Sequence, residues 1–288
     1  MPDLVSKCDK EHPMPRVAHK EILTPVIVRM DILEPQIAKK RRPGQFVILR
    51  INADGERIPL TIVDSDSKAG TITIVFQIVG KTTHMLAQLN EGEEILDIAG
   101  PLGRPTEIEP LGTVVVVGGG IGTAVAFPIA KGMKQAGNRV LSVVGARSKD
   151  LLVLEREVAL VSDEIVVTTD DGSYGQKGMV TGPLKEFLDN RQVGQVVAIG
   201  PVPMMKAVSE LTRPYGVKTI VSLNPIMVDG TGMCGSCRVS VGGTTLLACV
   251  DGPEFDGHKV DFDDLSTRLT AYREQERAAY EIFLKEKI

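Results

Sequence analysis

The stretch TVVVVGGGIGT, residues 113–123, decides how the middle of this chain folds. Its four consecutive valines are typical of a strand that is buried on both faces, as in a parallel sheet. Glycines follow, and a helix is expected from about residue 123 to 135. Such a turn suits a pyrophosphate group, because glycines allow close approach and the helix end presents free N–H groups.

The literal dinucleotide fingerprint G-x-G-x-x-G is not met, because the third glycine is Gly122 and Thr123 stands where the spacing requires it. A tight turn without any ligand is therefore the alternative. If the turn does bind a dinucleotide, we expect the contacts to come from Gly119, Gly120, Ile121 and Gly122.

Strands and helices alternate as far as residue 222, which favours a doubly wound parallel sheet of five strands. The other strands are expected at residues 139–145, 164–169, 195–199 and 218–222, and the other helices at 154–161, 182–188 and 203–211. In such sheets, ligands bind outside the carboxyl ends of the strands. Polar loops there add the candidates Arg147, Asp171, Gly200 and Met204. Residues 104–222 are thus predicted to form an α/β nucleotide domain.

Arg147 bears on the choice of nicotinamide cofactor. NAD sites place an acidic residue at the end of the second strand, whereas an arginine there suits the 2′-phosphate of NADP. This rule weakly favours NADP. The equal alternative is that Arg147 is a surface arginine that binds no ligand.

Residues 1–103 show short strands separated by turns. We expect strands at 18–23, 26–33, 46–51, 60–63, 71–79 and 94–98, and one helix at 82–89. This pattern is typical of an antiparallel β-barrel or a sandwich. The basic run from Lys39 to Arg42 is interpreted as a solvated turn.

Two segments of this region combine polar residues with proline or glycine, Arg57–Thr61 and Gln77–Thr83. Composition alone favours an edge strand and a helix N-cap. The second segment enters its helix through Gly80 and two threonines, and a helix end of this kind also suits a phosphate.

Three of the four cysteines lie in MVDGTGMCGSCRVSVGGTTLLACV, residues 227–250. Thiolates at this spacing suit an iron–sulfur cluster, zinc or copper. Asp229 occupies the position that completes a C-x4-C-x2-C run. We predict a [2Fe-2S] cluster held by Asp229, Cys234, Cys237 and Cys249, with a zinc site that recruits Asp229 or His258 as the alternative. A charged helix expected at 265–287 either docks a partner or packs on this segment.

The bulk composition argues against several classes of protein. A net charge of −4, no tryptophan and 4% aromatic residues give little support to nucleic-acid binding. No apolar run reaches the roughly 18–20 residues of a membrane span, and the N-terminus lacks the apolar core of a signal peptide. We expect a cytoplasmic protein, in which thiols stay reduced and Cys8 is free.

The motifs together resemble the ferredoxin–NADP reductase superfamily. They are R-x-P-L-T from Arg57, Q-x-V-G-K-T-T from Gln77, G-P-L-G at residues 100–103 and V-V-G-G-G-I-G. The runs D-G-T-G-M-C-G-S-C-R-V and A-C-V-D-G-P-E-F-D-G-H are similar to those of dihydroorotate dehydrogenase electron-transfer subunits. They resemble still more closely the small subunits of NADH-dependent ferredoxin:NADP oxidoreductases, which are electron-bifurcating heterodimers.

The resemblance implies an FAD-binding barrel, an NAD(H)-binding second domain and a cluster-binding segment at residues 223–288. It implies FAD contacts from Arg57, Pro59, Leu60, Thr61, Gln77, Val79, Thr82 and Thr83. Electrons would pass singly to a larger subunit that carries FAD and [4Fe-4S] clusters, and the complex would serve ferredoxin. No catalytic side chain is predicted, because the cofactors carry the chemistry.

Two departures from the family patterns stand out. The flavin motif is usually R-x-Y-S or R-P-x-S, whereas here Ile58 separates Arg57 from Pro59, so the register of Arg57 is open. Dihydroorotate dehydrogenase subunits have cysteine where this chain has Asp229, which favours the bifurcating type over them. The resemblance implies NAD(H) as the cofactor, whereas Arg147 at the end of the second strand suits NADP. We give the resemblance more weight. A zinc-stapled nucleotide-binding regulator is the remaining alternative.

Overall fold

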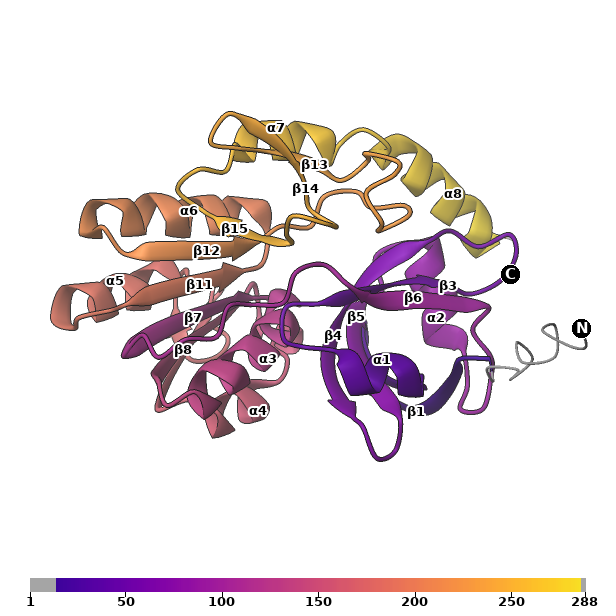
Figure 1. Ribbon diagram of the computed structural model, residues 1–288, viewed down its shortest axis with the longest axis horizontal. Coiled ribbons are helices and arrows are strands. Elements are labelled where there is room, and N and C mark those ends of the chain that lie inside the picture. Colours follow the sequence, from indigo (N-terminus) through magenta and orange to yellow (C-terminus); the bar gives the residue numbers. More distant parts are fainter. Residues whose placement is uncertain (1–13, 286–288) are drawn as a thin grey trace, which may run out of the picture.

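The computed structural model describes residues 14–285 and shows a barrel, an α/β unit and a C-terminal segment that touches both (Figure 1). The barrel is a six-stranded antiparallel sheet in the order β1-β2-β5-β4-β3-β6. Its strands are β1 (Arg16–Thr24), β2 (Ile27–Leu33), β3 (Phe46–Arg50), β4 (Ile58–Asp66), β5 (Thr71–Gln77) and β6 (Asp97–Leu102).

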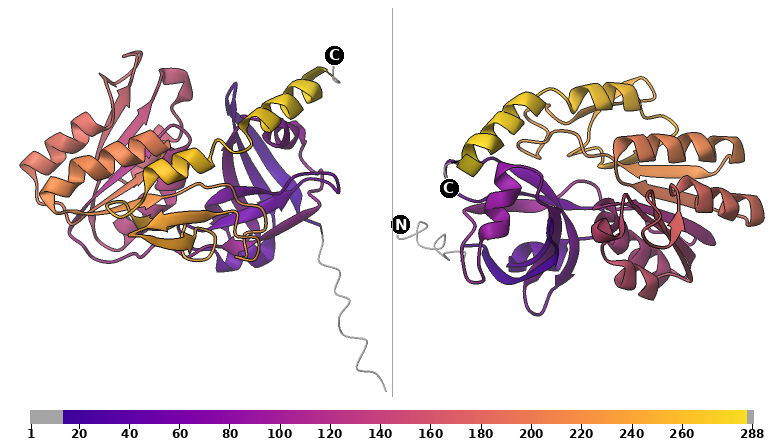
Figure 2. Two further views of the ribbon diagram at one scale, coloured as in Figure 1. Left: turned by 90° about the horizontal axis from the view of Figure 1, so that it is seen from above. Right: turned by 180° about the vertical axis from the view of Figure 1, so that it is seen from behind.

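The sheet closes because the segment before β6 pairs with β1. The N–H of Val17 donates to the carbonyl of Glu93 at 2.9 Å, and the N–H of Ile95 donates to Pro15 at 2.8 Å. Buried isoleucines and other apolar side chains fill the interior, and Figure 2 shows the closed outline from behind. The predicted bounds of the last strand, 94–98, are wrong. β6 begins at Asp97, and Glu94 makes only an isolated bridge to Arg16.

Two short helices lie on the barrel, α1 (Pro35–Lys40) and α2 (Lys81–Gln88). The solvated-turn interpretation of the basic run is wrong in part. Lys39, Lys40 and Arg42 are exposed, but the two lysines end α1 and Arg41 points inward. The side chain of Arg41 is 11% exposed, and its Nη2 lies 2.6 Å from an oxygen of Asp64. Asp64 also accepts from Lys131 of the α/β unit at 3.0 Å. The basic run thus helps to join the two parts.

The α/β unit is a seven-stranded sheet in the order β10-β9-β8-β7-β11-β12-β15. The five expected parallel strands are present as β7 (Thr113–Gly119), β8 (Arg139–Ala146), β9 (Glu164–Thr169), β11 (Gln195–Ile199) and β12 (Lys218–Ser222). Two strands were not expected, the short parallel β10 (Gln176–Lys177) and the antiparallel β15 (Glu254–Asp256). Its helices are α3 (Gly122–Gln135), α4 (Glu155–Leu160), α5 (Thr181–Asn190) and α6 (Val202–Thr212). They cover both faces of the sheet, as a doubly wound fold requires (Figure 1).

The C-terminal segment is built into this sheet. Its strand β15 pairs with β12, with Val221 opposite Phe255. The hairpin β13 (Arg238–Val241) and β14 (Thr244–Leu247) precedes β15, and the helices α7 (Phe262–Arg268) and α8 (Arg273–Lys285) follow it. The single helix expected at 265–287 is therefore two helices.

Helix α8 packs on the barrel through α2 (Figure 1). The hydroxyl of Tyr280 lies 3.0 Å from Nδ1 of His84 in α2. The ring of Phe283 meets that of His84 edge to face, with centroids 5.4 Å apart. The C-terminal helix thus holds α2 from outside.

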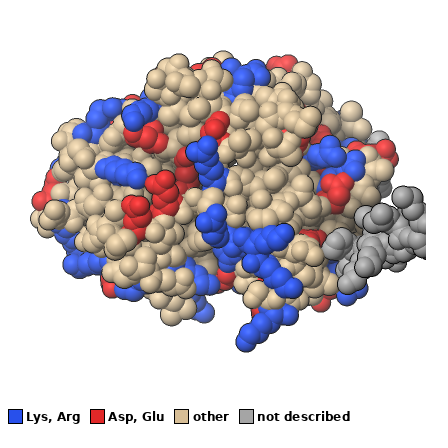
Figure 3. Space-filling model, viewed as in Figure 1, with Lys and Arg blue, Asp and Glu red and all other residues tan. Residues whose placement is uncertain are grey.

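The surface seen in Figure 3 carries acidic and basic side chains mixed together, with a row of basic side chains along its middle. This mixture agrees with the small net charge of −4. Between residues 14 and 285, no helix combines the length and apolar character needed to cross a bilayer. Cys8 lies outside the described residues.

Glu254 lies where the barrel, the interdomain linker and β15 meet. Its Oε1 accepts from Thr106 Oγ1 at 2.5 Å, and the N–H of Thr106 donates to Pro43 of the barrel at 2.9 Å. Burial raises the pKa of Glu254 to about 7, and the nearby charge of Glu107 acts in the same direction. The folded chain therefore holds this proton more tightly than the unfolded chain.

Replacing Glu254 with glutamine should stabilise the protein at pH 8 and change little at pH 5. The stability that protonated Glu254 contributes is complete at low pH and is lost as the pH rises through about 7. Glutamine stays neutral, so we expect a gain of about 1–2 kcal/mol at pH 8 relative to pH 5. Urea unfolding at both pH values measures it. The exposed Glu21 of β1, changed to glutamine, is the control and should show no such difference, because its charge does not act on Glu254; an equal effect in both variants would contradict the assignment.

Candidate functional site

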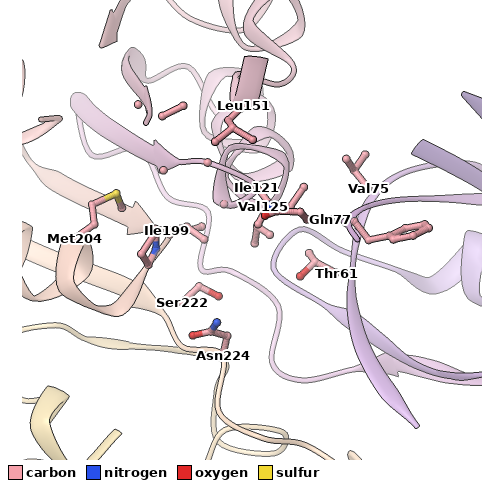
Figure 4. A pocket seen from close by; sticks show the side chains of 18 of the residues that line it. Thr61, Val75, Gln77, Ile121, Val125, Leu151, Ile199, Met204, Ser222 and Asn224 are labelled. Atoms are coloured by element: carbon pink, nitrogen blue, oxygen red, sulfur yellow. The ribbon is translucent and has the colours of Figure 1, made fainter. Parts of the chain in front are cut away.

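A cavity of about 830 Å³ lies between the barrel and the α/β unit. Figure 4 shows Thr61 and Gln77 on barrel strands across from Ile121 and Val125 of the α/β unit. Ser222, the last residue of β12, and Asn224 beyond it lie on a further side of the cavity. The cavity is therefore bounded by two sheets, with the carboxyl ends of parallel strands on one side.

Most of the predicted cofactor residues line this cavity. They are Pro59, Leu60, Thr61, Gln77, Val79 and Thr83 from the barrel and Gly119, Gly120, Ile121, Gly122, Arg147, Gly200 and Met204 from the α/β unit. The structure thus brings together loops that are more than a hundred residues apart in the sequence.

Three predicted residues do not line the cavity: Arg57, Thr82 and Asp171. Thr82 is buried and donates its hydroxyl to Glu56 at 2.6 Å. Asp171 accepts from the N–H and the hydroxyl of Ser173 at 2.9 and 2.6 Å, which lowers the pKa of its carboxyl. Its neighbour Asp170 faces the cavity instead.

Several lining residues were missed from the sequence. Ser222 ends a parallel strand and Asn224 follows it, so the rule about strand ends would have found them. Phe46 and Val75 carry no local signal, because their position depends on how the barrel strands pair. Met227 also lines the cavity, which connects the cysteine segment to it.

The glycine turn after β7 packs too closely for side chains. A Cβ on Gly122 would collide with the carbonyl oxygen of Ile199, and one on Gly119 would collide with the sulfur of Met204. Gly120 has a φ of +55° and open space beside it. The backbone can therefore approach a ligand closely at the N-terminus of α3, as a dinucleotide phosphate requires.

On the barrel side, Thr83 fixes the turn that leads into α2. Its Oγ1 accepts from the N–H groups of Val79 and Gly80 at 3.0 and 3.1 Å. This cap holds residues 77–79 against the cavity, where Gln77 and Val79 lie.

The cysteine segment arranges its donors in two pairs. Asp229 accepts from the N–H of Cys234 at 2.7 Å and from that of Thr231 at 2.7 Å, and these bonds lower the pKa of its carboxyl. The sulfurs of Cys237 and Cys249 lie 3.2 Å apart and are buried. Burial, together with the neighbouring Cys237, raises the pKa of the Cys249 thiol to about 12.

His258 lies apart from these donors, with Nε2 2.9 Å from the hydroxyl of Thr212. Over residues 14–285, no three side chains of the His, Cys, Asp or Glu type converge as they would around a single metal ion. The zinc alternative that recruits His258 therefore has no geometric support.

Comparison with known proteins identifies two domains. Residues 23–106 match the family model of the oxidoreductase FAD-binding domain, and residues 224–261 match the iron–sulfur cluster binding domain of dihydroorotate dehydrogenase B. A relative from Thermotoga maritima, described as a homolog of the dihydroorotate dehydrogenase B (NAD(+)) electron transfer subunit, is 50% identical over 273 residues. The match covers 93% of this chain and 96% of the relative. The chain belongs to this family of electron transfer subunits and their homologues.

Other members and structures agree with this family assignment. The electron transfer subunit of dihydroorotate dehydrogenase B from Bacillus caldolyticus is 35% identical over 235 residues, covering 78% of this chain and 88% of the relative. A solved structure from a study of electron bifurcation by an NADH-dependent reduced ferredoxin-NADP oxidoreductase superposes with a TM-score of 0.90. It is 46% identical and covers 96% of this chain and 99% of its own. The expected FAD-binding and iron–sulfur domains and the superfamily resemblance are confirmed.

Replacing Gly122 with alanine should destabilise this family member, because the added Cβ collides with backbone that cannot move aside. Overpacking of this kind costs about 1–3 kcal/mol. Gly182 in α5 is the matched control, since nothing lies within 4 Å of a Cβ there, and its alanine variant should be unchanged or slightly more stable. Chemical unfolding of both variants tests this, and an equal stability of the two would contradict the close packing of α3 on β11.

Proposed function

We propose that the chain is the electron-transfer subunit of an NADH-dependent ferredoxin:NADP oxidoreductase. It exchanges hydride with NAD(H) at FAD and passes electrons singly through a [2Fe-2S] cluster to a larger subunit, in an electron-bifurcating complex. The observation that carries this proposal is the cavity, which the FAD-binding barrel, the glycine turn and Met227 of the cysteine segment all line.

The residues of the cavity suit two dinucleotides that meet in the middle. Residues 58–61 and 77–83 offer the barrel face to FAD, and Gly119–Gly122 at the start of α3 offer N–H groups to the phosphates of NAD(H). Arg57, Thr82 and Asp171 do not line the cavity, so we assign them no direct contact with either dinucleotide. FAD supplies the hydride acceptor that can also give up electrons singly. The apolar lining, which includes Phe46, excludes water from the place of transfer.

The two donor pairs of the cysteine segment suit a cluster of two irons. Three thiols and one carboxylate fit iron, because thiolates are soft ligands and each iron of such a cluster takes two protein ligands. The carboxylate of Asp229 is harder than a thiolate and should change the potential of the cluster. We therefore assign Asp229, Cys234, Cys237 and Cys249 as the ligands.

The partner is inferred to be a larger subunit with FAD and [4Fe-4S] clusters, in a heterodimer that serves ferredoxin. The support is that the relatives are named as electron transfer subunits, each one part of an assembly.

We place the domain boundaries at 1–103, 104–222 and 223–288. A second candidate function is that of the electron transfer subunit of a dihydroorotate dehydrogenase, because the 50% identical relative is described as a homolog of that subunit. Mass identification of the chain that co-purifies with this one distinguishes the two partners.

The flavin should be reduced much faster by NADH than by NADPH. Arg147 lines the cavity, but a single exposed arginine is not enough to select the 2′-phosphate. Anaerobic stopped-flow mixing of the purified, yellow-brown chain with each cofactor measures the two rates. A clear preference for NADPH would contradict the proposed role, and a colourless protein would favour the zinc alternative.

Asp229→Ala should lose or destabilise the cluster, and Asp229→Cys should keep it with a shifted potential. The matched control is Asp251→Ala, because Asp251 lies in the same segment and also accepts a backbone N–H, from Leu247 at 2.9 Å. Iron content and the visible spectrum report the cluster, and a redox titration reports its potential. An intact, unshifted cluster in Asp229→Ala would remove Asp229 from the ligand set.

A further inference from the structure

Gly230 lies where the cysteine segment touches the barrel. It is buried and has a φ of +74°. A Cβ at this position would lie 2.6 Å from Cγ1 of Ile48 and 2.8 Å from Cδ1 of Leu102. Both distances are shorter than real Cβ contacts, so a side chain at position 230 would force the cysteine segment or the barrel side chains to shift.

The barrel side of this contact has little room to yield. Ile48 is 1% exposed and belongs to an apolar core that also contains Met227, Cys237 and Cys249. It pairs across β3 and β4 with Pro59, which lines the cavity. Well-packed interiors transmit strain because they contain few voids. A larger residue at position 230 would therefore lift the cysteine segment away from the barrel.

We propose that Gly230 is a positioning residue that sets the separation between the flavin cavity and the cluster. This inference rests on the proposed function. Asp229 is its direct neighbour, and Met227 lines the cavity three positions earlier. The step is transfer of one electron, in which the reduced flavin is oxidised by one electron and the oxidised cluster is reduced by one. Electron tunnelling falls off steeply with distance, so the contact at Gly230 governs its rate.

The test uses the full chain, purified anaerobically with its flavin and iron. Flash photoreduction of the flavin, with a deazaflavin and a sacrificial donor, starts the transfer so that hydride arrival does not limit it. In Gly230→Ala we expect the cluster to be reduced severalfold more slowly than in the wild type. Flavin reduction by NADH, iron content and the visible circular dichroism of the cluster should stay unchanged, which a general loss of structure would not allow.

Gly243→Ala is the matched control. Gly243 also has a positive φ, +77°, but nothing lies within 4 Å of a Cβ there. It carries the same backbone strain without the contact, so its transfer rate should equal that of the wild type.

Transfer at the wild-type rate in Gly230→Ala would overturn the inference. If that variant does not fold, Leu102→Phe tests the same contact from the barrel side, since its ring needs the space beside Gly230. Slower transfer supports the inference, and an unchanged rate overturns it. A wild-type cluster that NADH leaves oxidised would refute the proposed function itself, and the inference with it.

Discussion

The structure depends on how the C-terminal segment is anchored at both ends of its cysteine loop. On one side, β15 adds an antiparallel strand to the parallel sheet beside β12. On the other, Gly230 rests on Ile48 of the barrel. One continuous apolar core runs through all three parts, from Phe46 in β3 through Val117 in β7 to Cys249. Because this core is shared, the flavin-binding and nucleotide-binding surfaces and the cluster donors have fixed relative positions.

The anchoring explains how a short loop can serve an electron path. Met227 of the cysteine segment lines the cavity, and the buried pair Cys237 and Cys249 is part of the shared core. Helix α8 adds a further support, because it packs through Tyr280 against His84 of α2, whose N-terminus faces the cavity. The packing of the domains on one another therefore fixes the positions of the groups that exchange electrons. Few reacting side chains are needed as a result.

The parallel strands and the helices of the α/β unit, and part of the cavity lining, could be predicted from the sequence. The valine run at β7 and the glycines after it are local signals, and they mark the turn that lines the cavity. β15 was missed because a three-residue strand has no periodicity and exists only through its pairing with β12. The break between α7 and α8, and the packing of α8 on the barrel, depend on contacts with α6 and α2. Likewise, the role of Arg41 depends on Asp64, which is distant in sequence.

The central claim is that electrons delivered by NADH reach a cluster in this same chain. It is tested most directly by adding NADH to the anaerobic full-length protein and recording the low-temperature electron paramagnetic resonance spectrum. We expect the flavin to bleach and the signal of a reduced [2Fe-2S] cluster to appear. A flavin that bleaches while the protein contains no iron, or while its cluster stays oxidised, would contradict it.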